Sequence, residues 1–258
     1  MPPLWFLVLW AGLVGLVVGS YLNVLAHRLP LGQSTVRPRS RCPACGAAIR
    51  ARDNLPVVSW LLLGGRCRDC GAPISPRYPL IEATTGVLFA ACVVRFGFAP
   101  ETVAAAVLGA LLVALAAIDF DHFLLPDKLT IPGIALGLAA QALLPSGSLV
   151  AGVRGALIGA GLLLAIAGAW ELLRGVEGMG LGDVKMLAMI GAFLGAGGVV
   201  VTLVFGTFAG SAVGLVLIAR RGGDLQAQLP FGVFLAAGGL VALFAGEPLI
   251  DSYLGLMR

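Results

Sequence analysis

Two aspartates stand at the ends of strongly apolar segments, in a chain that otherwise keeps almost all of its charge out of such segments. Asp119 lies in Ala-Ile-Asp-Phe-Asp (117–121), and Asp183 ends Gly-Leu-Gly-Asp (180–183). A carboxylate at a membrane edge costs free energy and points to a functional role. Two carboxylates that share one proton can hydrolyse a peptide bond, because the ionised one activates water and the protonated one polarises the carbonyl. Aspartic peptide hydrolysis is therefore one chemistry that this pair could perform.

Five further residues flank this pair and are predicted to support it. They are Asp121 and Asp127 beside the first aspartate, and Gly180, Gly182 and Lys185 beside the second. Pro126 should interrupt the helix and leave a short irregular segment at the membrane edge. Alternating glycines allow a close backbone approach. Whether the lysine ammonium acts on Asp183 depends on its direction, and an ordinary solvated loop is the alternative explanation for the acids.

Four cysteines form two C-x-x-C pairs. Cys42 and Cys45 make the first pair, Cys67 and Cys70 make the second, and a glycine follows each pair directly. Two such pairs can close a tetrahedral shell of four thiolates around zinc, and a shell with four protein ligands leaves no open position, so the predicted ion is structural. Two disulfides, a redox-active pair and an iron–sulfur cluster are the alternatives.

Membrane helices must position these residues. Of the 258 residues, 59% are hydrophobic and 12% are charged, and the mean hydropathy is +0.99, which is far from the balance of a soluble domain. A spanning helix needs about 20 mostly apolar residues. Eight windows qualify: 4–25, 79–96, 102–118, 129–145, 150–173, 184–197, 198–219 and 230–247. The predicted fold is an all-α polytopic membrane protein with about eight transmembrane helices and a small zinc-stapled cytoplasmic loop.

Basic residues orient these helices. The polar stretch from His27 to Pro79 contains nine arginines but only two acids, Asp53 and Asp69, and the positive-inside rule places such a stretch in the cytoplasm. Alternating spans then put both Asp119 and Asp183 on the cytoplasmic side. Topology and contact with the lipid bilayer explain the basic excess, and we predict no nucleic-acid partner.

The order of these motifs resembles that of bacterial type IV prepilin peptidases, which are GxGD-type aspartic membrane proteases. The resemblance covers essentially the whole chain: Gly-Ser-Tyr-Leu-Asn-Val (19–24), the paired cysteines, Arg-Tyr-Pro-Leu-Ile-Glu (77–82), Ile-Asp (118–119), Leu-Pro-Asp (125–127) and Gly-Leu-Gly-Asp-Val-Lys (180–185). It implies that Asp119 and Asp183 are the catalytic dyad. It also implies that the chain removes the basic leader from prepilin or pseudopilin substrates at the inner membrane, for type IV pili or type II secretion.

The same resemblance implies a second activity, in which S-adenosylmethionine methylates the new N-terminal residue. That site would have to be assembled near the loop, where Asn23, His27, Tyr78 and Glu82 are candidates. Asn23 could equally well be a helix-packing residue. The implied organisation is a first transmembrane helix (1–26), a cytoplasmic tetracysteine zinc-binding loop (27–78) and a seven-helix aspartic protease core (79–258).

Two other functional classes compete with this reading. An ion- or proton-coupled transporter would use intramembrane acids, but it would place them near the bilayer midplane and would often show internal repeats. A non-catalytic zinc-stapled assembly factor would use the aspartates only at helix ends. The oligomeric state is left open by the sequence.

Overall fold

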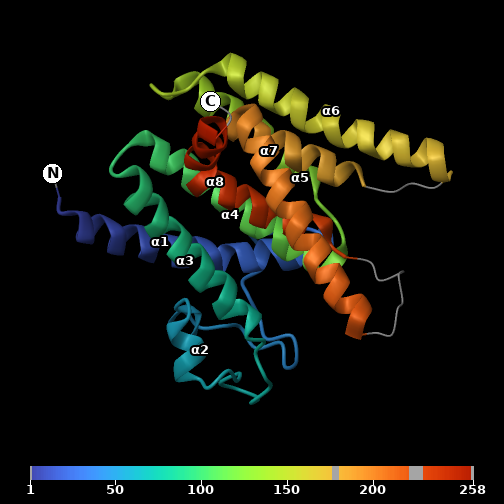
Figure 1. Ribbon diagram of the computed structural model, residues 1–258. Helices are drawn as coiled ribbons and strands as arrows, with labels where there is room; N and C mark the ends of the chain where they lie inside the picture. The colour runs from blue at the N-terminus through green and yellow to red at the C-terminus, as the bar shows by residue number, and fades with distance from the viewer. Residues whose placement is uncertain (1, 176–179, 221–228, 257–258) are drawn as a thin grey trace. The chain divides into compact units, whose positions relative to one another are not determined.

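The computed structural model describes residues 2–175, 180–220 and 229–256, and within them the chain is helical apart from two isolated β-bridges (Figure 1). Six helices there are long and apolar enough to cross a membrane. They are α1 (Leu4–Arg28), α3 (Arg77–Phe96), α4 (Pro100–His122), α6 (Leu149–Arg174), α7 (Leu181–Arg220) and α8 (Phe231–Leu256). The predicted all-helical membrane class is confirmed.

The predicted count of eight spans differs from these six at two places. Helix α5 (Asp127–Leu143) matches the predicted window 129–145 but has 17 residues, which is the lower limit for a span at about 1.5 Å per residue. The predicted windows 184–197 and 198–219 form the single 40-residue helix α7, whose backbone leaves helical torsion at Gly195 (φ 69°, ψ −174°). A bend at one glycine, rather than a loop, therefore separates the last two windows.

The chain divides into two compact units, Met1–Ala114 and Leu115–Arg258. In the first unit, α1 packs along α3 (Figure 1). Gly15 and Gly19, one turn apart on α1, allow this contact. A Cβ at Gly15 would lie 2.6 Å from the carbonyl oxygen of Thr85, and a Cβ at Gly19 would lie 2.7 Å from the Cα of Glu82. Small residues spaced in this way let helices approach closely in lipid.

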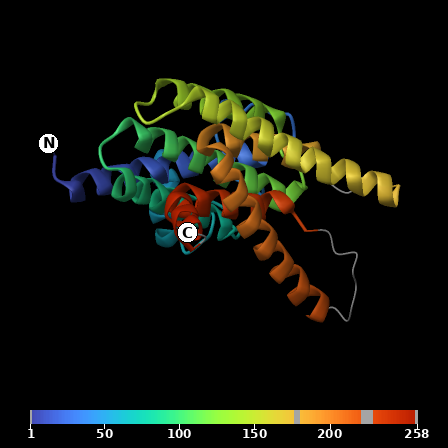
Figure 2. The ribbon, with the colours of Figure 1, turned by 45° about the horizontal axis from the view of Figure 1, so that its top comes forward.

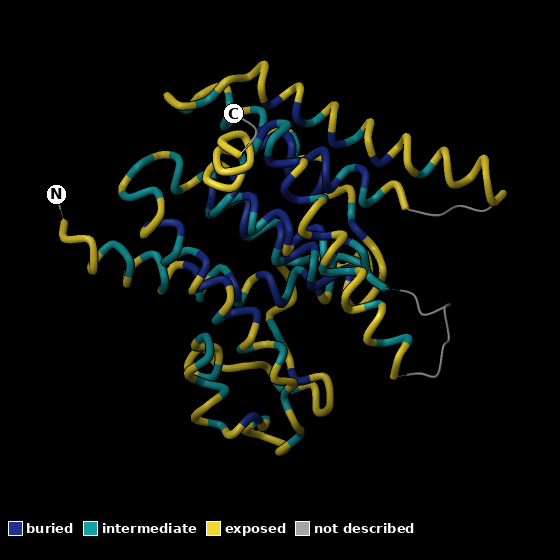
Figure 3. Tube along the Cα trace, in the orientation of Figure 1, coloured by how far each residue is buried: buried dark blue, intermediate teal, exposed yellow. Residues whose placement is uncertain are grey.

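The tetracysteine loop between α1 and α3 has little core of its own. It contains a 3-10 turn, η1 (Ala51–Asn54), and a short helix, α2 (Val58–Leu62), and most of its residues are exposed (Figure 3). Trp60 is its main apolar anchor, since its indole Nε1 donates to the carbonyl of Ile74 at 3.1 Å and its ring packs on Gly65. Such a segment needs another source of stability, and a bound metal is one.

The second unit is built around the first half of α7, which is almost wholly buried (Figure 3). Helix α6 lies along α7 in both ribbon views (Figures 1 and 2). Gly155 and Gly159 face α7, and a Cβ at Gly159 would lie 2.7 Å from the carbonyl oxygen of Leu187. Gly161 and Gly168 on the same helix have nothing within 4 Å of an added Cβ. Small residues in the first part of α6 therefore allow its close approach to α7.

Four residues connect α4 to α5. Helix α4 ends at His122, Phe123 adopts a positive φ of 51°, and Pro126 is extended before α5 begins at Asp127. Leu125, between them, is buried. This confirms the predicted short irregular segment, and it leaves Asp119 in the last turn of α4.

Candidate active site

Asp119 and Asp183 come together within the second unit. Asp119 lies in the last turn of α4, and Asp183 lies in the first turn of α7. Asp119 is only 5% exposed and Asp183 is half-buried. The two carboxylates are close enough for their charges to interact. The structure therefore joins two acids that are 64 positions apart in the sequence.

The start of α8 holds the carboxylate of Asp119. The backbone N–H of Val233 donates to its Oδ2 at 3.2 Å, and the N–H of Gly232 also faces it. Both residues belong to the first turn of α8, where backbone N–H groups have no partner inside the helix and carry partial positive charge. An anion is stabilised there, which compensates for the position of Asp119 at the less favourable C-terminal end of its own helix.

Two glycines and one leucine set the spacing around the acids. A Cβ at Gly232 would lie 2.8 Å from Oδ2 of Asp119 and 3.0 Å from Leu125, and a Cβ at Gly182 would lie 2.9 Å from the Cβ of Leu125. Leu125 therefore fills the space between the starts of α7 and α8. Gly180 differs, because it is exposed and the nearest atom to an added Cβ would be 3.9 Å away.

Lys185, Asp127 and Asp121 were also predicted to support the dyad, and the ion pair that the structure shows among them does not involve its carboxylates. Lys185 directs its ammonium to Asp127, with Nζ 2.5 Å from Oδ1, rather than to Asp183. This ion pair joins the start of α7 to the start of α5, and it is partly exposed. Asp121 is exposed, as expected for a residue about 200° around the helix from Asp119.

Sequence reasoning missed Gly232 and Val233 because neither has a titratable side chain. A signal was present, since Pro230 is the first residue of the apolar window 230–247 and a proline in that position marks a helix start. A helix start next to a predicted carboxylate is a natural anion-binding turn. Which helix start would meet which carboxylate could be learned only from the fold.

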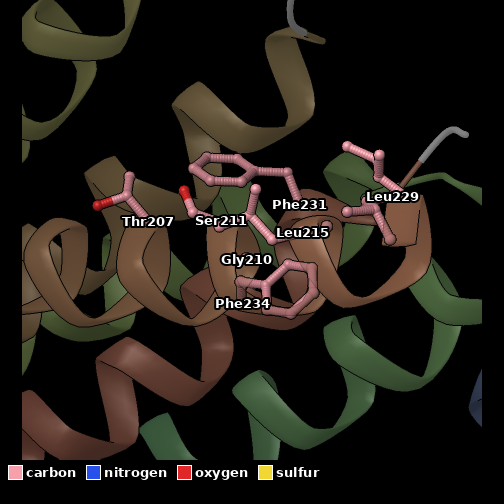
Figure 4. Close-up of a pocket in the computed structure, with 9 residues that line it drawn as sticks. Thr207, Gly210, Ser211, Leu215, Leu229, Phe231 and Phe234 are labelled. Atoms are coloured by element: carbon pink, nitrogen blue, oxygen red, sulfur yellow. The ribbon is translucent and has the colours of Figure 1, made fainter. Parts of the chain in front are cut away.

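An apolar groove lies beside this turn, between the second half of α7 and the start of α8 (Figure 4). Its volume is about 500 Å³. It is lined by Thr207, Gly210, Ser211, Gly214, Leu215, Ile218, Leu229, Phe231 and Phe234. Two hydroxyl groups are its main polar features, and Phe231 in its wall directly precedes Gly232. An apolar surface thus adjoins the turn that binds Asp119.

The four cysteines of the loop converge, with their sulfur atoms all within 4.8 Å of one another. Sγ of Cys42 and Sγ of Cys70, one from each pair, are 3.8 Å apart. A tetrahedral zinc site with bonds of about 2.3 Å requires sulfur atoms about 3.8 Å apart, and a disulfide requires about 2.05 Å. All four are free thiols. The cluster can hold a metal ion, and its geometry fits zinc better than two disulfides.

Both cysteine pairs fold in the same way. In each, the N–H of the following glycine donates to the carbonyl of the first cysteine at 2.9 Å, from Gly46 to Cys42 and from Gly71 to Cys67. Both glycines have a positive φ, 73° and 70°, a conformation that glycine adopts without strain. The glycine after each pair, noted in the sequence, is therefore required by the turn.

Backbone N–H groups already favour a thiolate at one of these cysteines. Those of Cys45 and then Ala44 face the sulfur of Cys42 and lower its pKa from the ordinary 9.0 to about 7. The pKa of Cys70 is raised to about 12, because the N–H of Ala72 lowers it but the neighbouring thiols and burial raise it by more. Thiolates this close repel one another, so a cation is needed for all four to be ionised together.

Two ion pairs tie the second cysteine pair to η1. Arg68 donates hydrogen bonds from Nε and Nη2 to the carboxylate of Asp53, at 3.0 and 2.7 Å. Nη2 of Arg50 lies 3.2 Å from Oδ1 of Asp69. The bidentate contact lowers the pKa of Asp53 and raises the pKa of Arg68. Each acid of the loop is thereby paired with an arginine, across 15 residues for Asp53 and 19 residues for Asp69.

Three of the four candidates for methyl transfer gather at the base of the loop. Nδ2 of Asn23 donates to the carbonyls of Gly19 and Tyr78, at 3.3 and 3.1 Å, and so joins α1 to α3. Glu82 is buried on α3, one turn after Tyr78. His27 is exposed, unlike Asn23 one turn earlier. The helix-packing role of Asn23 is therefore present in the structure.

Comparison with known proteins adds two family profiles and several curated relatives. The Bacterial Peptidase A24 N-terminal domain matches residues 13–96, and the type IV leader peptidase family matches residues 105–215. A prepilin leader peptidase/N-methyltransferase of Burkholderia pseudomallei (strain 1026b) is 42% identical over 264 residues, which is 93% of this chain and 85% of that protein. Proteins of the same name from Stutzerimonas stutzeri and Pseudomonas aeruginosa are both 39% identical, over 97% and 96% of this chain and 95% and 93% of their own lengths. No solved structure matches the chain.

Proposed function

The chain belongs to the type IV leader peptidase family, and we propose that it is a membrane aspartic endopeptidase that removes the leader from prepilin-like substrates with Asp119 and Asp183 as its catalytic dyad. One observation supports the assignment of the dyad above the others. These two acids, from different helices, share one enclosed position, whereas Asp121 and Asp127 are exposed.

The chemistry needs one carboxylate and one carboxylic acid. The ionised member removes a proton from water as the oxygen attacks the scissile carbonyl, and the protonated member donates a hydrogen bond to the carbonyl oxygen and later supplies a proton to the leaving nitrogen. Two like charges close together resist joint ionisation, so the pair retains one proton. Enclosure by Leu125 and the start of α8 limits bulk water, which strengthens these interactions.

Substitution of each acid tests the dyad. Asp119→Asn and Asp183→Asn should each abolish leader removal from a prepilin-type peptide by the full-length protein in membranes or detergent, as read by mass spectrometry. Asp251→Asn, at an exposed acid on α8, is the matched control and should cleave normally. Near-normal cleavage by either test variant would exclude that residue from the dyad.

Zinc is proposed as a structural ion held by Cys42, Cys45, Cys67 and Cys70, whose thiolates would fill its whole shell. Bound there, the ion would fix the tetracysteine loop without taking part in hydrolysis. The sulfur spacing and the matching turns support this proposal.

The name of the relatives, prepilin leader peptidase/N-methyltransferase, supports methylation of the exposed amino group with S-adenosylmethionine as a second activity. We place the protein in the bacterial inner membrane with the dyad facing the cytoplasm, on the strength of the arginine-rich loop. Its proposed substrates are prepilins or pseudopilins of pilus or type II secretion systems. Neither a transporter nor a non-catalytic assembly factor is favoured by an observation in the described residues.

A further inference from the structure

Glu82 is a buried acid that takes no part in the proposed aspartic dyad. It lies in the second turn of α3, and it is 8% exposed. Its Oε2 accepts the backbone N–H of Val57 at 2.7 Å. Buried carboxylates are normally paired with a cation, yet within the described residues Glu82 has no ion-pair partner. The structure therefore contains a buried carboxyl group whose one hydrogen-bond donor among the described residues is a neutral backbone N–H.

The second carboxylate oxygen of Glu82, Oε1, is not completely enclosed. Oε1 makes no hydrogen bond to the described residues. It is not sealed in the interior either, because the single fully buried side-chain N or O atom without a partner in that part of the chain is Oγ1 of Thr202. An incoming group can thus donate a hydrogen bond to Oε1 while Val57 keeps Oε2 fixed.

The neighbours of Glu82 hold the carboxylate in place from two sides. On the helix side, Gly19 packs against its Cα and Asn23 locks α1 to α3 through Gly19 and Tyr78. On the loop side, Val57 has a φ of 60° and a ψ of −49°, a strained conformation for a β-branched residue. Strain of this kind costs of order 1–3 kcal/mol and tends to occur at functional sites. The strained turn aims the N–H of Val57 at the carboxylate.

We propose that Glu82 binds the amino group exposed by leader removal and accepts a proton from it in methyl transfer. A primary amine suits the position because it supplies N–H donors, and positive charge when protonated, to an unpaired carboxylate. This inference rests on the proposed N-methyltransferase function. It makes Glu82 a catalytic residue separate from the aspartic dyad.

The proposed step balances in atoms and charge. The neutral amine attacks the methyl carbon of a sulfonium donor, an N–C bond forms as the C–S bond breaks, and the electron pair of that bond stays on sulfur as a thioether. The nitrogen is then a methylammonium, and it passes one proton to the carboxylate of Glu82. The acid thereby becomes neutral and releases the product more easily.

Glu82→Gln is the sharpest test, because its amide oxygen can still accept the N–H of Val57 while the charge is lost. We expect leader cleavage to continue at the normal rate and methyl transfer to fall on the order of 100-fold. The Michaelis constant for the mature peptide should rise and that for the methyl donor should not. Glu171→Gln, at an exposed acid on α6, is the matched control.

Peptide binding without the methyl donor provides a readout that is independent of turnover. The unchanged protein should bind a mature pilin-type peptide with a free N-terminus more tightly than the same peptide with an acetylated N-terminus. The Glu82→Gln protein should bind both peptides equally. Fluorescence anisotropy with a label at the C-terminus of the peptide measures this difference.

Three results would overturn the assignment of Glu82. Normal methylation by Glu82→Gln would make the acid a structural link between Val57 and α3. An effect confined to the Michaelis constant of the donor would assign the carboxylate to the donor's own amino group. Parallel loss of cleavage and methylation by a folded Glu82→Gln protein would refute a role for Glu82 that is separate from the aspartic dyad. Failure of the proposed function looks different, because the unchanged chain would then neither cleave nor methylate the substrate.

Discussion

Gly232 is the position at which one added methyl group should disturb Asp119 most directly. In Gly232→Ala the new Cβ would lie 2.8 Å from Oδ2 of Asp119 and 3.0 Å from Leu125, whereas ordinary contacts begin at 3.4 Å. The carboxylate or the start of α8 must therefore move by about 0.6 Å, and misplacement of a catalytic group by about 1 Å can cost 100-fold in rate. We expect kcat for leader cleavage to fall between about 10- and 100-fold, which corresponds to about 1.4–2.7 kcal/mol of transition-state stabilisation.

A control on another helix separates this effect from a general effect of alanine. Gly161→Ala, on α6, places a Cβ where nothing lies within 4 Å, so it should cleave normally. Overpacking at Gly232 also lowers the free energy of unfolding. The assay therefore reports kcat per folded molecule, and thermal unfolding in detergent measures the folded fraction. A folded Gly232→Ala protein that cleaves at the normal rate would refute the reasoning that the start of α8 fixes Asp119.

Two further predictions concern the metal site and the helix packing. We expect elemental analysis of the purified protein to find one zinc per chain, which Cys42→Ser should lose and Cys92→Ala, at a buried thiol on α3 outside the cluster, should keep. Retention of one zinc per chain by Cys42→Ser would contradict the four-thiolate shell. Gly155→Ala should lower the free energy of unfolding by about 1–3 kcal/mol, because its Cβ would meet the backbone of Gly191 on α7. A steric-trap measurement tests this, and an unchanged free energy of unfolding would contradict the close contact.

The parts of the site that depend on short sequence spacing could be predicted. Each cysteine pair with its glycine forms a local turn, and the turn alone aims two sulfur atoms at one point. Most helix bounds were predicted to within four residues, because apolar windows report where a chain crosses a membrane, but α8 runs nine residues beyond its predicted end at 247. The bend at Gly195 was not, since a glycine between two apolar windows is compatible with a loop or with a continuing helix.

Contacts between distant segments could not be predicted from the sequence. Lys185 could have turned to Asp183, and the ion pair with Asp127 arises because α5 and α7 start side by side. Glu82 meets Val57 through a strained turn 25 residues earlier. A single sequence has no periodicity or spacing that specifies such pairs, because they follow from how the helices pack rather than from any local pattern.

We infer that helix α8 contributes to the proposed catalytic site, although the match to the type IV leader peptidase family ends at residue 215. Its first turn, from Phe231 to Val233, supplies the N–H groups that bind Asp119, 114 residues earlier in the chain. A carboxylate at the C-terminal end of α4 would otherwise face carbonyl groups and be destabilised. The proposed dyad therefore depends on the contact between Asp119 and the first turn of α8, and it draws on the second unit beyond the two aspartate motifs.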